Sequence, residues 1–511
     1  MKTIEDKINF IYSIEERFEV DNWKINDLRI WPIIRINLGF YLFYKYGQKT
    51  ATFKKTHKYL KYLKLIGNSI TVFFNYVGAV FFSISRSLIN EEKDSNYFFL
   101  TLSYDSILIK DKYYNKLIDP IIDQINCDNT GVKVFEYRTA GLFKYPTFRS
   151  SNYLFWHPLF FKIRSLIFKT KILSCQLKGF DAFIQYLNDS KIPIENFTLE
   201  RLVNYLTFVE LNATYFVKVF KTHNVKIAFT TEYYSLLSLS MIVAANRSRI
   251  PSIDIQHGLQ NEYHFSYAKW CKLPNEGYEL LPKYFFVWSN KEYNLINSWN
   301  GKQHEPIITG NLFLNKFKNF ESDFVNVYNV QAESIRNSDK LNILLTLQDK
   351  IPPIWLIEFI NNSSDRIEWW IRSHPVWTNV LTELLRKIDL KVKTFLPDPL
   401  LISSLPLYSI LKVIDINVIQ TSTTIIESSL FNKPTLIIDK EGLLHYKSYI
   451  ENNIAYSALN KSDFEMHINK LSIQGGIREK SVDHVHVLDI KLLLKDIENR
   501  VFKNSEARSK K

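Results

Sequence analysis

Short apolar runs alternate with amphipathic stretches along most of the chain. Runs rich in Val, Ile, Phe and Trp predict buried strands, and stretches with apolar residues every three to four positions predict helices. The strands are expected at 97–102, 132–136, 227–230, 252–256, 284–288, 306–309, 341–347, 368–372, 417–420 and 435–439, and three helices at 115–125, 236–246 and 423–431. Strands that alternate with helices predict mainly parallel sheets with crossover helices.

A polar stretch at 315–340 interrupts this rhythm, which then restarts with the strand at 341–347. The chain has 511 residues, too many for one ordinary core. We therefore expect an α/β protein of two Rossmann-like, doubly wound domains, at 1–325 and 326–490, followed by a helix and basic tail at 491–511. Ligands of open α/β sheets bind outside the carboxyl ends of the strands, so a central cleft that both domains face is the expected active site.

Two segments of the first half combine apolar and basic residues. A run without any charged residue spans 65–85 and follows five lysines, and aromatic and basic residues are interleaved at 153–171. The first run could lie on an anionic membrane surface, form a buried core helix or span the bilayer. We expect helical membrane-associating insertions at about 50–90 and 150–175, and hence peripheral contact with an anionic membrane.

Composition excludes several classes of protein. The chain has 14 glycines and no G-x-G pair, which argues against the dinucleotide fingerprint and the P-loop. Three cysteines without a C-x-x-C pair argue against a disulfide framework and indicate a reducing, cytoplasmic compartment. The 65 Lys and Arg exceed the 52 Asp and Glu by 13, but this charge alone does not indicate nucleic-acid binding. No D-x-D occurs, so neither a metal nor another cofactor is expected.

The most informative segment follows the strand at 417–420. Four hydroxyl residues, Thr421, Ser422, Thr423 and Thr424, stand where the next helix must begin. Hydroxyls cap free N–H groups, and a helix N-terminus favours a phosphate. Glu427, one turn later, could accept hydrogen bonds from a ribose. An ordinary capped crossover helix with a solvated glutamate explains the same pattern.

Two further strand ends carry candidate chemistry. Arg372, His374 and Pro375 follow the strand at 368–372; arginine offers a fixed fork to phosphate oxygens, and imidazole can donate to the same group. A His-Pro pair is also common in loops without such a role.

Glu232 follows the strand at 227–230, and Gln256, His257 and Gly258 follow the next strand. Two neighbouring parallel strands would present a carboxylate and an imidazole to one cleft, which suits acid–base or nucleophilic catalysis. Gly258 would allow a close backbone approach. Each of these residues taken alone is more often structural.

The order of these motifs resembles a known group, the two-domain GT-B glycosyltransferases that build bacterial capsules and lipopolysaccharide O-antigens. The resemblance runs through Trp31-Pro32-x-x-Arg35, Asp119-Pro120, Glu232, Gln256-His257-Gly258, Thr309-Gly310-Asn311, Arg372-x-His374-Pro375 and Ser422-Thr423 with Glu427. The QHG and HP motifs resemble those of Kdo and sialic-acid transferases and of teichoic-acid glycerophosphotransferases. The resemblance implies that His374, Ser422 and Thr423 hold the donor phosphate, that Glu427 binds the ribose and that Gly310 lies on the donor side, while Glu232 and His257 serve the reacting sugar.

The expected function is transfer of a sugar from a nucleotide donor, CMP-linked donors included, to a lipid-linked or growing bacterial surface polysaccharide. The enzyme would work without a metal, in the cytoplasm, at the inner face of the membrane. The alternatives are a nucleotide-sugar epimerase or CDP-polyol phosphotransferase of the same fold, and a non-catalytic scaffold of the polysaccharide synthesis machinery.

Overall fold

A computed structural model describes residues 3–45, 71, 73–81, 95–109, 111–125, 131–138, 142–154, 172–314, 323–363, 366–374, 377–474 and 488–509. The chain divides into two compact units. Unit 1 comprises 1–312 and 485–511, and unit 2 comprises 313–484. The division was expected at 325/326, and the C-terminal helix expected at 491–511 belongs to unit 1.

Unit 1 is built on a seven-stranded sheet in the order β12-β11-β10-β9-β3-β6-β7, and every neighbouring pair is parallel. Its strands are β3 (Tyr97–Leu102), β6 (Val132–Tyr137), β7 (Ser151–Tyr153), β9 (Ile227–Thr230), β10 (Ser252–Ile255), β11 (Tyr284–Val287) and β12 (Glu305–Ile308). Successive side chains of a strand point to opposite faces, and both faces of this sheet are buried. Phe98 packs into the core on one face, and its neighbour Phe99 packs into the core on the other.

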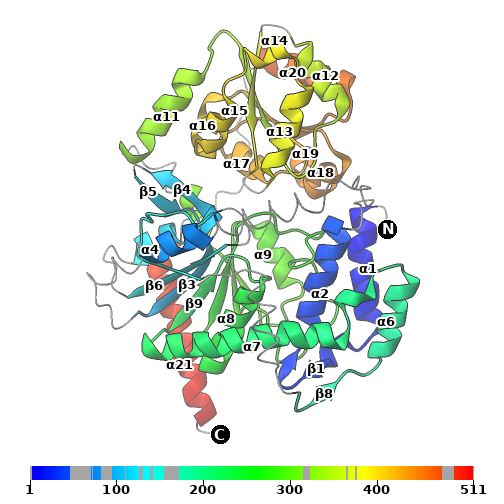
Figure 1. The fold of residues 1–511 in the computed structure, drawn as a ribbon, viewed down its shortest axis with the longest axis vertical. Coiled ribbons are helices and arrows are strands. Elements are labelled where there is room, and N and C mark those ends of the chain that lie inside the picture. The colour runs from blue at the N-terminus through cyan, green and yellow to red at the C-terminus, as the bar shows by residue number, and fades with distance from the viewer. Residues whose placement is uncertain are drawn as a thin grey trace. The chain divides into compact units, whose positions relative to one another are not determined.

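Helices cover both faces of this sheet (Figure 1). The helices of unit 1 are α1 (Ile4–Arg17), α2 (Trp31–Phe40), α4 (Asp119–Ile125), α6 (Phe180–Asp189), α7 (Leu199–Thr222), α8 (Leu236–Ser248), α9 (Asn290–Asn297) and α21 (Ile490–Ser509). Helices α1, α2, α7 and α8 contribute to the core on the Phe98 face, and α4 and α21 to the core on the Phe99 face. The sheet is therefore doubly wound.

Short elements complete unit 1. They are the helical turns η1 (Val20–Asn22), η2 (Tyr41–Lys45), η3 (Ser103–Asp105) and η4 (Ile194–Asn196), an antiparallel sheet of β1 (Lys24–Ile25), β2 (Leu28–Arg29) and β8 (Cys175–Gln176), and the hairpin β4 (Ser106–Ile109)–β5 (Lys112–Asn115). Helix α8, which follows Glu232, begins at the N-cap Ser235, whose hydroxyl accepts a hydrogen bond from the backbone N–H of Ser238. This cap fixes where the chain turns from β9 into α8.

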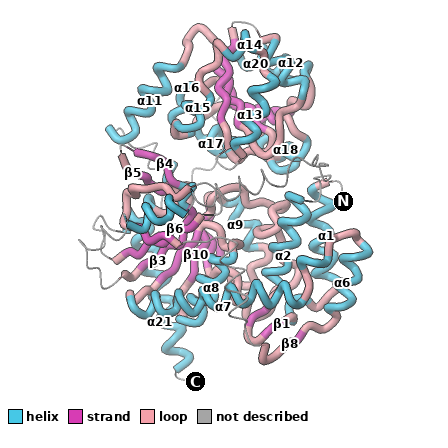
Figure 2. The backbone as a smooth tube through the Cα atoms, in the orientation of Figure 1, coloured by secondary structure: helices cyan, strands magenta, loops and turns pink. Residues whose placement is uncertain are grey.

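Unit 2 contains a five-stranded parallel sheet in the order β14-β13-β15-β16-β17. The strands are β13 (Leu341–Thr346), β14 (Ile367–Arg372), β15 (Ile416–Ile419), β16 (Thr435–Ile437) and β17 (Ala455–Ser457). The helices are α11 (Asp323–Ile335), α12 (Ile354–Asn361), α13 (Thr378–Lys387), α14 (Leu390–Lys393), α15 (Pro399–Ser404), α16 (Leu407–Val413), α17 (Thr424–Leu430), α18 (Lys440–His445), α19 (Lys447–Glu451) and α20 (Lys461–Gln474). Helices α12, α13 and α20 share one core with the sheet (Figure 2).

The predicted fold class, two doubly wound α/β units with parallel sheets, is confirmed. All ten predicted strands are present, and their ends differ from the predicted ones by at most two residues. The helix predicted at 115–125 is wrong in its first part, because Lys112–Asn115 is strand β5 and α4 begins at Asp119. Strands β1, β2, β4, β5, β7, β8 and β17 were not predicted.

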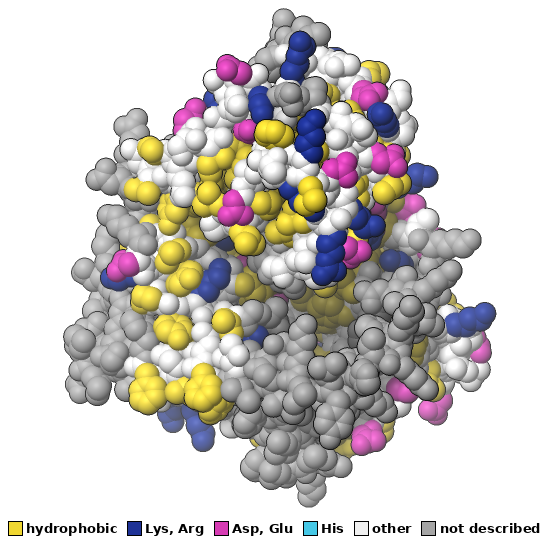
Figure 3. Space-filling view, turned by 45° about the horizontal axis from the view of Figure 1, so that its top comes forward, with side chains coloured by type: hydrophobic (Ala, Val, Ile, Leu, Met, Phe, Trp, Pro, Cys, Tyr) yellow, Lys and Arg dark blue, Asp and Glu magenta, His cyan; other side chains and the backbone are white. Residues whose placement is uncertain are grey.

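The two segments predicted to associate with a membrane, at about 50–90 and 150–175, lie mostly outside the described residues. Helical residues 73–81 are described; they expose Phe73, Phe74 and Phe81, and they pack Ala79 against Phe143. No helix in the described ranges is both long and apolar enough to cross a bilayer. Among the described residues on the face in Figure 3, Lys and Arg are interspersed with acidic and apolar side chains.

Candidate functional site

At the centre of the sheet in unit 1, the direction in which successive strands are added to the sheet changes. From β3 the chain runs through α4 to β6 on one side, whereas β9, which pairs with β3 on the other side, continues to β10 and β11. The loops after β3 and β9 therefore lead to opposite sides, and this switch point, which we call the crevice of unit 1, is where open α/β sheets bind ligands. The loop after β3 carries Tyr104, and the loop after β9 carries Glu232.

Glu232 lies in this crevice and is largely shielded from water. The Tyr104 hydroxyl donates a 2.6 Å hydrogen bond to its Oε1 atom. Burial raises the pKa of Glu232 to about 8, against an opposing effect of the Tyr104 hydrogen bond, and Asp105 adds to the rise. The carboxyl is therefore mainly protonated at pH 7, with a pKa close to the pH at which an acid–base group works best.

His257 lies beside Glu232, as predicted from the two strand ends. Its Nε2 atom is 3.7 Å from Glu232 Oε1, and it shares a 3.0 Å hydrogen bond with the hydroxyl of Tyr234. Burial lowers the pKa of His257 to about 4, so the imidazole is neutral at pH 7. The pair is thus a protonated carboxyl beside a neutral imidazole rather than an ion pair.

Groups at the end of β3 that hold this pair were not predicted from the sequence. The Lys144 ammonium donates hydrogen bonds to the backbone oxygens of Tyr104, at 3.2 Å, and of Ser106, at 2.5 Å, on either side of the buried Asp105. Burial lowers the pKa of Lys144 to about 8 and raises the pKa of Asp105 to about 6. The available signal was the position of Tyr104 and Asp105 directly after a buried strand.

Gln256 and Gly258 have different places in the same loop. The Gln256 amide donates to the Gly258 carbonyl at 2.9 Å and accepts from the Trp288 backbone N–H at 2.7 Å, so it joins the ends of β10 and β11. A Cβ atom at Gly258 would meet nothing within 4 Å. The space beside Gly258 is therefore open among the described residues, and the close approach that was expected there stays a prediction.

Gly310 follows β12 in unit 1 and has a φ of 70°, a conformation that favours glycine. Its backbone N–H donates to the Val287 carbonyl at 3.3 Å, at the edge of the sheet. The other residues predicted to bind the donor belong to unit 2.

The hydroxyl run lies at the corresponding crevice of unit 2, where β13 and β15 are neighbours and the chain continues from them in opposite directions. The Ser422 hydroxyl accepts the Thr424 backbone N–H at 3.3 Å, but the N-cap residue Thr423 makes no side-chain cap bond. The predicted capping is thus correct for Ser422 and wrong for Thr423. The buried Thr424 hydroxyl accepts from the Asn417 amide at 3.3 Å, which leaves Thr421 and Thr423 as the half-buried hydroxyls of the run.

A buried amide oxygen lies beside this run. Gln420 is 4% exposed, its Nε2 donates to the Ile351 carbonyl at 3.3 Å, and its Oε1 has no hydrogen-bond donor in the described structure. Buried acceptors are nearly always satisfied. A ligand that donates an N–H or O–H would satisfy this one.

Arg372 uses one nitrogen of its guanidinium to bind the protein. Its Nη1 donates to the backbone oxygens of Ile402, at 2.8 Å, and Leu405, at 2.7 Å, which are carbonyls at the end of α15. Burial lowers the pKa of Arg372 to about 10, and the charge of Glu427 opposes this. The guanidinium is still charged at pH 7, and Glu427 lies close enough to affect it. His374 is half-buried two residues later, and Pro375 lies outside the described residues.

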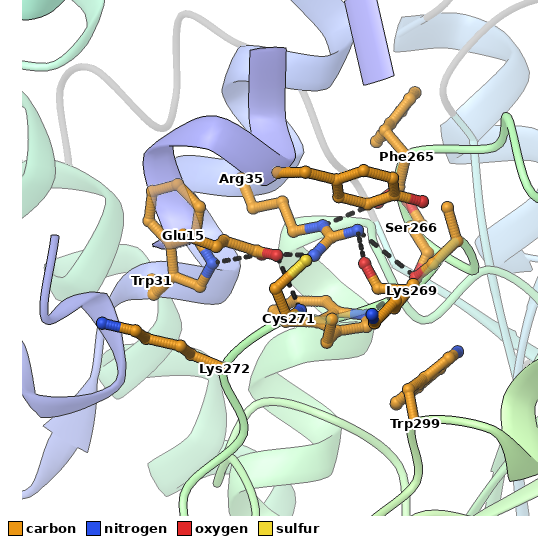
Figure 4. Close-up of polar contacts among 12 residues, drawn as sticks. Glu15, Trp31, Arg35, Phe265, Ser266, Lys269, Cys271, Lys272 and Trp299 are labelled. Carbon is orange, nitrogen blue, oxygen red and sulfur yellow. Dashed lines mark hydrogen bonds and ion pairs between the residues drawn. The ribbon is translucent and has the colours of Figure 1, made fainter. Parts of the chain in front are cut away.

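The Trp31-Pro32-x-x-Arg35 segment forms a buried ion pair and not a ligand site (Figure 4). Arg35 of α2 pairs with Glu15 of α1, and both side chains are fully buried. Glu15 also accepts from Trp31 Nε1 and from the Cys271 backbone N–H, each at 2.8 Å. The remaining guanidinium N–H groups donate to backbone oxygens of Phe265, Ala268 and Lys269. The pair therefore joins two helices to the loop that follows His257.

A cavity of about 250 Å³ opens beside Glu232 within unit 1. It is bordered by α2, by the end of β6 and by the start of α8 and is partly open to solvent, and its lining residues are Ile33, Ile36, Asn37, Phe40, Tyr137, Glu232, Tyr234, Ser235, Leu236, Leu237 and Leu239. No group of three or more His, Cys, Asp or Glu that could hold a metal occurs in the described part of the chain.

Comparisons with known proteins come from structure alone. No protein-family model matches the chain, and no curated protein matches it. A UDP-GlcNAc 2-epimerase from Neisseria meningitidis bound to UDP-GlcNAc is similar at 12% identity and a TM-score of 0.45, over 79% of this chain and 99% of that one. A putative UDP-N-acetylglucosamine 2-epimerase from Listeria monocytogenes is similar at 11% identity and a TM-score of 0.45, over 80% and 96%. The wall teichoic acid polymerase TagF is similar at 11% identity and a TM-score of 0.43, over 86% and 99%.

Proposed function

We propose that the chain is a GT-B-type, metal-independent glycosyltransferase that transfers a sugar from a nucleotide donor to an acceptor hydroxyl in bacterial surface polysaccharide synthesis. The single observation that carries this proposal is the meeting of Glu232 and His257 at the crevice of unit 1, with the pKa of Glu232 at about 8. Unit 1 would bind the acceptor, and unit 2 the nucleotide.

Glu232 would act as the general base. Its ionised form takes the proton of the acceptor hydroxyl, the acceptor oxygen bonds to the anomeric carbon, and the bond from that carbon to the donor phosphate breaks, so that the electron pair leaves with the nucleotide. The neutral His257, hydrogen-bonded to Tyr234, would orient the acceptor. A carboxylate nucleophile in a retaining reaction would use the same residue.

Unit 2 would hold the nucleotide at the end of β15. The half-buried hydroxyls of Thr421 and Thr423 and the unsatisfied Oε1 of Gln420 lie there, and His374 and Glu427 are the further contacts that we propose. Arg372 would stabilise the donor phosphate by its charge while it holds α15.

A thermal-shift panel with CMP, CDP, UDP and GDP tests the nucleotide site. A ligand that binds only the folded state raises the melting temperature with its concentration, so one of the four should do so at millimolar concentration. Thr423→Val should weaken this shift and leave the ligand-free melting temperature unchanged, because the Thr423 hydroxyl makes no cap bond. A non-catalytic scaffold would show no shift with any of the four.

Transfer itself tests the catalytic pair. Glu232→Gln and His257→Ala should each abolish most of the transfer and keep the nucleotide shift. Transfer at the wild-type rate in both variants would exclude this site. An epimerase of the same fold would instead convert its nucleotide sugar without any acceptor, and the protonated Glu232 would suit it as a general acid.

Peripheral attachment to the inner face of the cell membrane is part of the proposal. Phe73, Phe74 and Phe81 are 48%, 67% and 68% exposed on helical residues 73–81, where they could enter an anionic bilayer surface. Pelleting with vesicles that contain phosphatidylglycerol should fall when all three are changed to Ser, and pelleting that is unchanged would exclude this segment as the contact.

A further inference from the structure

The cavity beside Glu232 has a polar end and an apolar end. The polar end is formed by the loop after β9, with Glu232, Tyr234 and Ser235. The apolar end is formed by side chains of α2 and α8, among them Ile36 and Leu239, which are 4% and 1% exposed. Phe40, at the end of α2, is 41% exposed and lies at the boundary with solvent.

The polar groups that line this cavity already have protein partners. The Tyr137 hydroxyl bonds to the Ser235 hydroxyl at 2.8 Å, and the Asn37 amide donates to the Ile33 carbonyl at 2.8 Å. Glu232 accepts from Tyr104 outside the lining. Apart from Glu232, a sugar ring placed here would find few groups to replace the water lost from its several hydroxyls, and this burial is unfavourable. A hydrocarbon group would gain from burial.

We propose that this cavity binds the hydrocarbon part of an amphiphilic acceptor, directly beside the hydroxyl that Glu232 activates. The inference rests on the proposed function for the role of that hydroxyl. An apolar cavity of about 150 Å³ holds benzene, with its six carbons, so a cavity of about 250 Å³ has room for roughly ten carbon atoms.

A chain-length series of n-alkanols, from butanol to tetradecanol, tests the assignment by calorimetry on the full chain at pH 7. Each methylene that enters the cavity should tighten binding about fourfold, until the cavity is full at roughly ten carbons, and longer chains should gain nothing further. Affinity that keeps rising through tetradecanol, or that is absent throughout, overturns the proposal.

Three variants show where the alkanols bind. Ile36→Trp fills the cavity and should shorten the longest chain that still gains affinity, whereas Leu239→Ala enlarges the cavity and should lengthen it. Ile354→Trp is the matched control, because Ile354 lies on the surface of α12 in unit 2 and is 62% exposed. If Leu239→Ala folds and leaves the limit where it is in the wild type, the proposal is wrong even if Ile36→Trp fails to fold.

Failure of this inference is distinguishable from failure of the proposed function. If the protein transfers a sugar from a nucleotide donor but alkanol affinity does not level off at roughly ten carbons, the cavity assignment is wrong and the proposed transferase activity stands. If the chain length at which alkanol affinity levels off changes in both cavity variants, but the protein binds no nucleotide, the cavity assignment is supported and the transferase is excluded.

Discussion

The Tyr104 hydroxyl donates to Glu232 across the point where the chain leaves the neighbouring strands β3 and β9 in opposite directions. A hydrogen bond from a neutral donor favours the ionised carboxylate, so Tyr104 limits the rise that burial produces in the pKa of Glu232. Tyr104 is therefore a positioning residue for the base as well as a link between two strands.

Tyr104→Phe should raise the pKa of Glu232 further. Hydrogen bonds to charged groups contribute about 1.5–3 kcal/mol, which corresponds to about one pKa unit or more. If Glu232 is the general base, transfer by the wild type rises with pH through about 8, and in Tyr104→Phe this rise should move about one unit higher. Activity lost at pH 7 should then return near pH 9.

Tyr137→Phe is the control for this profile, because the Tyr137 hydroxyl bonds to Ser235 and not to Glu232. Its rise should coincide with that of the wild type. A rate that instead falls above pH 8 in the wild type would assign Glu232 the role of general acid and would favour the epimerase.

Glu232→Gln should make stability less sensitive to alkaline pH. The pKa of Glu232 is raised in the folded state from its ordinary value of 4.5 to about 8. The folded state therefore holds the proton more tightly, and this stabilisation is complete below about 4.5 and is lost as the pH rises through about 8. Glutamine resembles the protonated carboxyl and has no proton to lose.

Between pH 6 and 9 the wild type should lose about 3 kcal/mol more stability than the variant, since two units of pKa difference are crossed at about 1.4 kcal/mol each. Melting temperatures across this range measure the difference. The exposed Glu262 provides the matched substitution, and Glu262→Gln should follow the wild-type curve. Parallel curves for all three proteins would show that Glu232 is ionised in the folded state.

The sequence predicted that Glu232 and His257 lie close together, but it did not predict Tyr104, which holds Glu232 in place. Glu232 and His257 follow consecutive strands of a parallel sheet, so their proximity follows from the strand pattern. Tyr104 contacts Glu232 only because β3 and β9 pair with each other, although more than 120 residues separate these two residues along the chain. The periodicity of each strand does not indicate the order of the strands in the sheet. The hairpin β4–β5 was missed because the sequence between its strands, Lys-Asp at 110–111, is none of the Asn-Gly or Asp-Gly pairs that mark short hairpins.

Tertiary contacts also engage groups that the sequence pattern offers to a ligand. Arg372 follows a strand as an arginine for phosphate would, yet the carbonyls at the end of α15 occupy its Nη1. Trp31 and Arg35 matched a motif by spacing, but their polar atoms satisfy the buried Glu15. These partners lie in other elements, and the residues near the motif in sequence do not indicate them.

Arg35→Met should destabilise unit 1 strongly. It leaves Glu15 buried without its cation, and removal of one partner from a buried ion pair costs about 3–5 kcal/mol. Glu15→Gln combined with Arg35→Met should lose less than the sum of the two single variants, because the uncompensated charge is gone. Melting temperatures of the four proteins give the coupling, and strictly additive effects would contradict a buried pair. Arg247→Met, at a half-exposed ion pair with Glu210, should cost much less.

Gly442→Ala should displace the proposed nucleotide site. Gly442 lies in α18, and a Cβ atom there would stand 1.9 Å from the backbone oxygen of Gln420 and 2.8 Å from a methyl of Ile437. A backbone atom cannot move aside as a side chain can, so α18 and the loop at 420–423 must separate. The expected cost is about 1–3 kcal/mol of stability, together with loss of the nucleotide-induced rise in melting temperature. Gly258→Ala is the control, since that Cβ atom enters open space, and it should change stability by no more than about 0.5 kcal/mol. A nucleotide shift that survives in a folded Gly442→Ala variant would place the nucleotide away from the end of β15.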